Sequence, residues 1–141
     1  MKKALGCLSM AALAIVLAAP VSAQTITLKA SVPFDFTIGG RIMPAGDYVL
    51  STSGGSGVLQ VWSVAKGIAP TFVAINAGNG PSDGDGASLT FNRYRGDYFL
   101  TGIWESSTIG GCSVPMSRTE REKAKSASIG KPEIVMVLAR R

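Results

Sequence analysis

The clearest pattern in this chain is a strict alternation of apolar and polar residues over positions 26–38. Every even position is apolar: Ile26, Leu28, Ala30, Val32, Phe34, Phe36 and Ile38. The odd positions hold polar residues or Pro33. A period of two predicts a long β-strand with one buried face. Pro33 supplies no N–H to a ladder, so this point must be an edge, a bulge or an exit between sheets.

More segments of strand character follow, separated by turn residues. Gly39-Gly40 and Pro44-Ala45-Gly46 mark tight turns. Alternating or apolar runs predict strands at residues 41–43, 47–51, 58–64, 71–75, 88–94, 98–105 and 133–139. The arm at 98–105 is apolar on both faces, which predicts a central strand covered on both sides. Gly-rich composition predicts loops at 76–87 and 108–113.

One short helix is expected near the C-terminal end of the chain. Ser117 and Glu120 have the spacing of a capping box, in which each side chain bonds the other's backbone N–H. The helix would cover residues 118–127 and, without a large apolar stripe, would be exposed. The elements together predict an all-β fold, an antiparallel β-sandwich or small barrel of about seven strands with this one helix.

Residues 1–23 predict an export signal that is not part of the fold. Two lysines precede an apolar run at residues 8–19, and small residues end at Ala23. The run is short for a bilayer span, which needs about 20 residues. We expect cleavage after Ala23, location in the periplasm or outside the cell, and a single domain over residues 24–141.

The residue types that most enzymes use are missing. The chain has no His, which removes the usual general base and the commonest metal ligand. After loss of the signal, Cys112 stands alone, which excludes an internal disulfide and a thiolate metal site. Phosphate-binding and nucleophile-elbow motifs are also absent. We therefore expect a protein that is not an enzyme, with no cofactor and no catalytic, cofactor-binding or metal-ligating residue.

Two short motifs have both a functional and a structural interpretation. Alternating Asp and Gly at 83–86 could offer oxygen ligands to calcium. The EF-hand spacing, however, would place Pro81 and Asn92 where acids are needed, which favours a flexible loop. Arg95-Gly96-Asp97 spells an adhesion tripeptide, but a tight turn needs Gly and Asp as well, and the turn is favoured.

Aromatic side chains and a basic segment offer two further binding hypotheses. Four aromatics could line a carbohydrate platform, although strand aromatics usually belong to a core, as we expect for Trp104: Trp62, Tyr94, Tyr98 and Trp104. Residues 118–141 hold seven basic and three acidic residues, a net charge of +4. This end could contact an anionic envelope surface, or could simply be a solvated face. Nucleic acid is not expected for an exported chain.

Several longer motifs occur in order along the chain. They are Val-Pro-Phe-Asp-Phe-Thr-Ile-Gly-Gly at 32–40, Met-Pro-Ala-Gly-Asp-Tyr at 43–48, Leu-Thr-Phe-Asn-Arg-Tyr at 89–94, Gly-Asp-Tyr-Phe-Leu at 96–100 and Pro-Met-Ser-Arg-Thr-Glu-Arg-Glu at 115–122. In this the chain resembles a group of small secreted acidobacterial proteins of unknown function. Met43 and Met116 depart from the Leu and Lys usual there. The resemblance implies export and a shared fold, and implies no activity or ligand.

The expected function is a binding or structural role in the cell envelope or outside the cell. One alternative is a self-assembling subunit, because the first strand starts directly after the cleavage point and could pair with a neighbouring chain as a donor strand. Pairing of that strand within its own sheet is the simpler interpretation. A carbohydrate-binding module is the weaker alternative.

Overall fold

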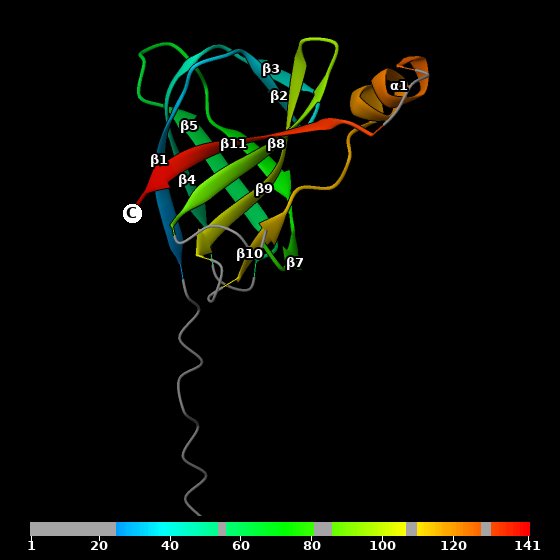
Figure 1. The fold of residues 1–141 in the computed structure, drawn as a ribbon. Coiled ribbons are helices and arrows are strands. Elements are labelled where there is room, and N and C mark those ends of the chain that lie inside the picture. The colour runs from blue at the N-terminus through cyan, green and yellow to red at the C-terminus, as the bar shows by residue number, and fades with distance from the viewer. Residues whose placement is uncertain (1–24, 54–55, 81–85, 107–109, 128–130) are drawn as a thin grey trace, which may run out of the picture.

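The structure is a computed structural model that describes residues 25–53, 56–80, 86–106, 110–127 and 131–141. The expected signal peptide lies outside these residues, as do Asp83 and Asp85 of the calcium-like motif. The described chain is mostly β-structure with one helix (Figure 1). Its elements are β1 (Ile26–Val32), β2 (Phe36–Ile38), β3 (Arg41–Met43), β4 (Gly46–Thr52), β5 (Val58–Ser63), β6 (Thr71–Ala74), β7 (Asn76–Gly78), β8 (Ser88–Tyr94), β9 (Asp97–Ser106), β10 (Gly110–Ser113), α1 (Arg118–Ser126) and β11 (Glu133–Arg140).

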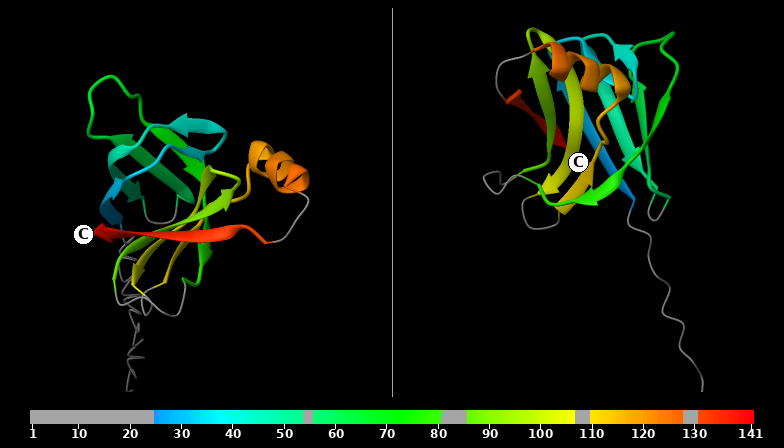
Figure 2. Two further views of the ribbon diagram at one scale, coloured as in Figure 1. Left: turned by 45° about the horizontal axis from the view of Figure 1, so that its top comes forward. Right: turned by 90° about the vertical axis from the view of Figure 1, so that its right-hand side faces the viewer.

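Nine of these strands form a nearly closed barrel in the order β3-β2-β9-β8-β11-β1-β4-β5-β6 (Figure 2). Outside this path, β10 pairs with β9 and with β7. The expectation of a β-rich fold with one short helix is confirmed. The expected seven strands were too few, since the described residues form eleven. A purely antiparallel arrangement was also wrong, because β2 runs parallel to β9.

The parallel pair arises where the opening alternation is interrupted. The chain leaves β1 at Val32, passes Pro33, and enters β2 at Phe36. β1 pairs with β4 over its whole length, whereas β2 pairs with β9 and β3. Pro33 thus marks an exit from one half of the barrel to the other, which is one of the three roles expected for it. The alternation continues through the break, because Val32, Phe36 and Ile38 are all buried.

The two strands that sequence composition missed are built largely from glycine and small residues. β7 and β10 pair with each other in segments that were expected to be loops. Gly111 lies opposite Trp104 in the β9–β10 pairing, and a Cβ atom at Gly111 would collide with the Trp104 ring and the Ile103 carbonyl. Glycine is therefore required here by the bulk of its neighbour, not by loop flexibility.

The barrel interior is filled by apolar side chains from nearly every strand. The residues under 2% exposed include Leu28, Val32, Ile38, Met43, Tyr48, Leu50, Leu59, Val61, Leu89, Phe91 and Ile103. The seam between β3 and β6 is closed by side chains: Arg41 donates a hydrogen bond to Thr71 at 3.3 Å, and Thr71 donates one to the Met43 sulfur at 3.7 Å. The barrel is therefore continuous in packing although its backbone ladder is not.

The helix α1 lies against the outer side of the barrel (Figure 1). Ser117 caps it, because its hydroxyl accepts a hydrogen bond from the Glu120 N–H at 3.1 Å. The expected return bond from the Glu120 carboxylate to Ser117 is not formed. Glu120 is instead buried at 3% exposure and accepts a bond from Asn92 Nδ2 on β8. The helix is exposed as expected except at this one anchor.

Candidate functional site

A row of outward-facing side chains crosses four neighbouring strands of the barrel. Lys29 on β1 lies directly opposite Arg140 on β11 and Val49 on β4, and Val49 lies opposite Trp62 on β5. Residues paired across antiparallel strands project from the same face of the sheet. Leu28 and Ala30 beside Lys29 are buried, so the row containing Lys29 is on the outer surface.

Two positively charged residues, Lys29 and Arg140, occupy paired positions in this row. Lys29 and Arg140 are both exposed, and within the described chain neither makes an ion pair. Like charges directly opposite each other on neighbouring strands are destabilising. Lys29 and Arg140 are such a like-charge cross-strand pair, an arrangement that a bound anion would stabilise.

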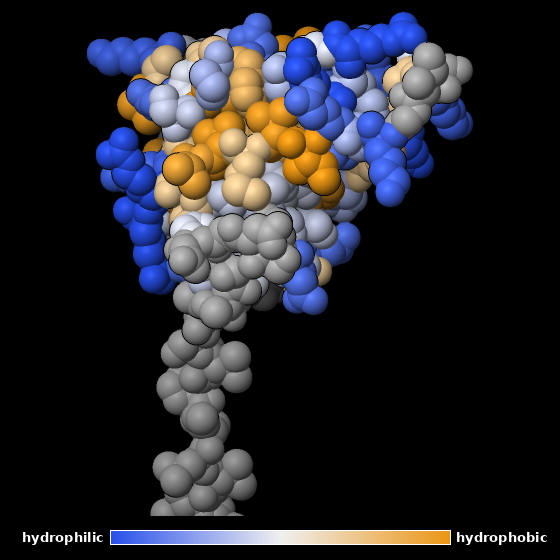
Figure 3. Space-filling view, in the orientation of Figure 1, coloured by the Kyte–Doolittle hydropathy of each residue, from blue (hydrophilic) through white to orange (hydrophobic). Residues whose placement is uncertain are grey.

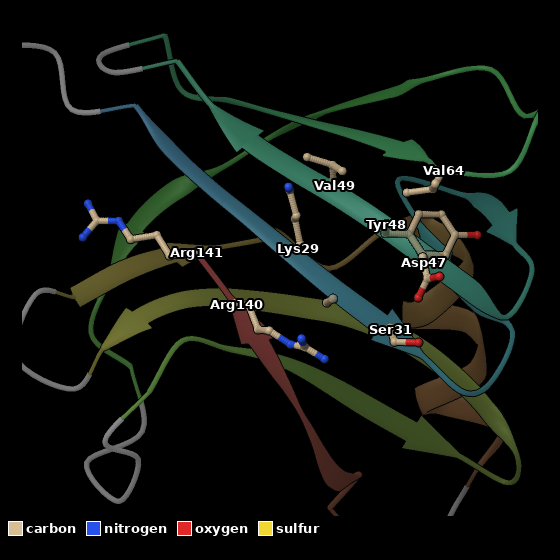
Figure 4. Close-up of a pocket in the computed structure, with 9 residues that line it drawn as sticks. Lys29, Ser31, Asp47, Tyr48, Val49, Val64, Arg140 and Arg141 are labelled. Atoms are coloured by element: carbon tan, nitrogen blue, oxygen red, sulfur yellow. The ribbon is translucent and has the colours of Figure 1, made fainter.

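The pair borders a groove of about 420 Å³ between β1, β4 and β11. Its lining is mixed, with charged, hydroxyl and aliphatic side chains: Lys29, Ala30, Ser31, Asp47, Tyr48, Val49, Val64, Arg140 and Arg141. Figure 4 shows Lys29 and Arg140 leaving neighbouring strands, with Ser31 and Asp47 at one end of the groove. Among the side chains of this lining, three are cations and one, Asp47, is a carboxylate.

Ion pairs fix both ends of β11, which carries Arg140. At one end Arg93 Nη1 lies 3.0 Å from Glu133 Oε2. At the other end, Arg141 Nη2 forms an ion pair with Glu105 Oε1 over 2.7 Å. This oxygen is buried, and no hydrogen bond to it from the described residues has good geometry. Arg140 and Arg141 point in opposite directions, so Arg141 neutralises Glu105 while Arg140 stays at the groove (Figure 4). Within the groove lining, the positive charges without an ion-pair partner are therefore those of Lys29 and Arg140.

Tyr48 forms part of the groove lining from the barrel side. Its ring is 1% exposed and its hydroxyl donates a hydrogen bond to the Pro44 carbonyl. Burial is the main cause that raises the pKa of Tyr48 above its ordinary value, with a smaller contribution from Asp35 and an opposing one from Ser63. Tyr48 is therefore neutral at physiological pH, and its ring belongs to the barrel interior behind the groove.

The basic segment seen in the sequence does not form one surface. Within residues 118–141, the positive charges divide between α1 and the end of β11, which lie far apart (Figure 1). On α1, Arg118 pairs with Glu122 at 3.1 Å and Lys123 pairs with Asp97 at 2.8 Å. The site instead combines Arg140 with Lys29, from the opposite end of the chain. Only the register between β1 and β11 brings them together.

The four aromatic candidates do not gather into a platform. Trp104 is 8% exposed and donates a hydrogen bond from Nε1 to Thr90 Oγ1 at 3.0 Å, as a buried Trp should. Tyr94 is also buried, and Tyr98 stacks on Phe34 with ring centroids 3.8 Å apart. Trp62 alone faces outward, in the row with Lys29. Trp104 is buried, as predicted, but its ring packs against glycines of β7, β9 and β10 and is not part of the main apolar cluster.

The remaining sequence candidates contribute little chemistry. Arg95 and Gly96 adopt positive φ angles of 52° and 107° in the turn between β8 and β9, so the tripeptide is a hairpin turn as expected. Cys112 is partly buried on β10, and burial raises the pKa of its thiol. In the described part of the chain, no three Cys, Asp or Glu side chains cluster as a metal site would require.

No helix among the described residues is long and apolar enough to span a bilayer. Comparisons with protein-family models, with curated proteins and with solved structures find no match for this chain.

Proposed function

We propose that this protein is an exported, non-enzymatic binding protein whose groove between β1, β4 and β11 takes anionic ligands in the cell envelope or outside the cell. The observation that carries the proposal is the Lys29–Arg140 pair, two unpaired cations held opposite each other beside an open groove. Their repulsion disfavours the empty groove and would be relieved by carboxylate, phosphate or sulfate oxygens.

Export is supported by the composition of residues 1–23 and by the resemblance to small secreted proteins. The absence of His from the whole chain supports a role without acid–base catalysis. The donor-strand alternative has less support, because β1 already pairs with β4 along all seven residues and with β11 at Lys29 and Ala30. A neighbouring chain could take up this strand only if the barrel opened.

Retention on an immobilised sulfated polysaccharide such as heparin tests the proposal, since it presents a dense anionic surface. Lys29→Gln and Arg140→Gln should each elute at lower salt than the unchanged protein, and the double variant lower still. Lys66→Gln removes the same charge from an exposed position outside the groove and is the matched control. If Lys66→Gln lowers the elution salt as much as Lys29→Gln does, binding follows overall charge and the groove is not the site.

A further inference from the structure

The outer face of β11 carries a continuous apolar stripe. Ile134, Met136 and Leu138 are 70%, 43% and 77% exposed and occupy alternate positions of the strand. Figure 3 shows a band of apolar side chains across this face of the molecule, with hydrophilic residues on both sides. Single exposed aliphatic residues are ordinary, but a row of three on one strand face marks an interaction surface.

The stripe lies beside an unpaired strand edge. β11 pairs with β8 over Glu133–Leu138, whereas its pairing with β1 is limited to Ala139 and Arg140. β1 ends at Val32 and the chain leaves the strand at Pro33, so no described strand pairs with this edge of β11 over Glu133–Leu138. Val135 and Val137, on the inner face of the strand, are partly buried and pack against the barrel core.

The stripe continues directly into the basic groove. Arg140 occupies the next alternate position after Leu138, so it projects from the same face as the apolar side chains. Lys29 stands opposite Arg140 in the register. At the other end of the strand, Lys131 is exposed, and the Glu133 carboxylate between it and the stripe is paired with Arg93 at 3.0 Å. A row of apolar side chains with cations beyond both ends is complementary to a partner with an apolar interior and an anionic surface layer.

A second copy of the chain is a poor occupant for this surface. If two free edges paired antiparallel about Met136, the Lys131 end of one chain would lie toward Lys29 and Arg140 of the other. Such a pairing would add positive charge to positive charge at both ends of the interface. The charge pattern therefore favours an anionic partner over self-association.

We propose that the outer face of β11 docks on an anionic lipid bilayer, with Ile134, Met136 and Leu138 entering the interface and lipid phosphates bound by Lys29 and Arg140. This inference rests on the proposed function, because it identifies lipid head groups as the anions that the groove takes. β11 would lie along the membrane surface, with its exposed apolar face toward the bilayer.

Vesicle co-sedimentation tests this docking, with the same N-terminus on every variant so that residues 1–24 contribute equally. The protein should sediment with vesicles of phosphatidylglycerol and phosphatidylcholine, weakly with phosphatidylcholine alone, and less in high salt. The double variant Ile134→Ser/Leu138→Ser should lower the partition coefficient by about tenfold. Lys29→Gln/Arg140→Gln should lower it by about 25-fold, at about fivefold per charge. Ile42→Ser, at a 74% exposed position on β3, should change nothing.

A spectroscopic readout keeps the test valid if the double serine variant folds poorly. Leu138→Trp should show a blue-shifted emission on addition of anionic vesicles, whereas Ile42→Trp should not. Three results would overturn the inference: no sedimentation of the unchanged protein with anionic vesicles, equal loss with Ile42→Ser, or a dimer in light scattering that Ile134→Ser/Leu138→Ser abolishes. If heparin retention depends on Lys29 but the protein does not bind vesicles, the proposed anion-binding function is supported and only the assignment of lipid as the ligand is wrong.

Discussion

Asn92 Nδ2 donates a hydrogen bond to Glu120 Oε1 over 2.9 Å, and this contact attaches α1 to the outer side of β8. The Tyr94 hydroxyl lies 3.4 Å from the same oxygen. Glu120 is the one residue of the helix that is buried, so an otherwise polar helix is positioned by a carboxylate and not by an apolar stripe.

Removal of this carboxylate should destabilise the protein. Glu120→Ala leaves the Asn92 amide and the Tyr94 hydroxyl without their buried partner, and we expect a loss of about 2 kcal/mol in the free energy of unfolding, measured in urea. Glu122→Ala, which breaks the exposed pair with Arg118, should cost less than about 0.5 kcal/mol. Equal losses in the two variants would contradict the anchoring role of Glu120.

Gly111 should tolerate no side chain. A Cβ atom there would overlap the Trp104 ring and the Ile103 carbonyl, so Gly111→Ala should cost about 2 kcal/mol or more and alter the near-ultraviolet circular dichroism of Trp104. Gly86→Ala is the matched control, because a Cβ at Gly86 meets no atom within 4 Å. An unchanged midpoint for Gly111→Ala would mean that β10 is not held against Trp104.

Reversal of one groove charge should separate stability from binding. Lys29→Glu places opposite charges across the β1–β11 pairing, so the free energy of unfolding should rise by about 0.5 kcal/mol. The same variant should lose heparin retention. Lys66→Glu should leave stability unchanged within error. A fall in stability for Lys29→Glu would show that the two cations do not repel each other in the folded protein.

Tyr48 should make the protein sensitive to alkali. Burial raises its folded-state pKa above the unfolded value of about 10, so its contribution to stability is complete below pH 10 and is lost as the pH rises through the folded pKa. Thermal unfolding midpoints should therefore fall above pH 10. Tyr48→Phe should be less stable at pH 8, because the bond to Pro44 is lost, but its stability should fall less between pH 9.5 and 11.5. Parallel curves would contradict this assignment.

Cys112 should react slowly. Burial both restricts access to its thiol and raises the thiol pKa, which lowers the thiolate fraction at pH 8. Alkylation by iodoacetamide should be several-fold slower in the folded protein than in urea, as measured by mass spectrometry. Equal rates would show that β10 opens freely from β9.

The β-rich fold could be predicted because alternation reports burial directly. Leu28, Val32, Phe36 and Ile38 are buried, as their even positions indicate. The number of strands could not be predicted in the same way. Gly110–Ser113 has no alternation to detect, and its strand forms because glycine fits beside Trp104, a contact that depends on tertiary structure.

The candidate site was only half visible in the sequence. Residues 118–141 were recognised as basic, but their pairing with Lys29 depends on the β1–β11 register, which no local pattern encodes. Glu120 offered a clearer signal that was missed. It shares a helix face with Ala124 and Ala127, at spacings of four and seven, and that is the least polar face of α1. A charged residue on the inward face of a helix indicates a buried polar partner.

The pairing of Lys29 with Arg140 joins residues more than one hundred positions apart. Contacts of such long range form late in folding, because the intervening chain must first be ordered. Pairing of β1 with β11 and assembly of the proposed anion-binding groove are therefore one event: a chain that has not formed this pairing displays neither the paired cations nor the groove. Only molecules in which β1 and β11 have paired would thus be able to bind a ligand at this surface.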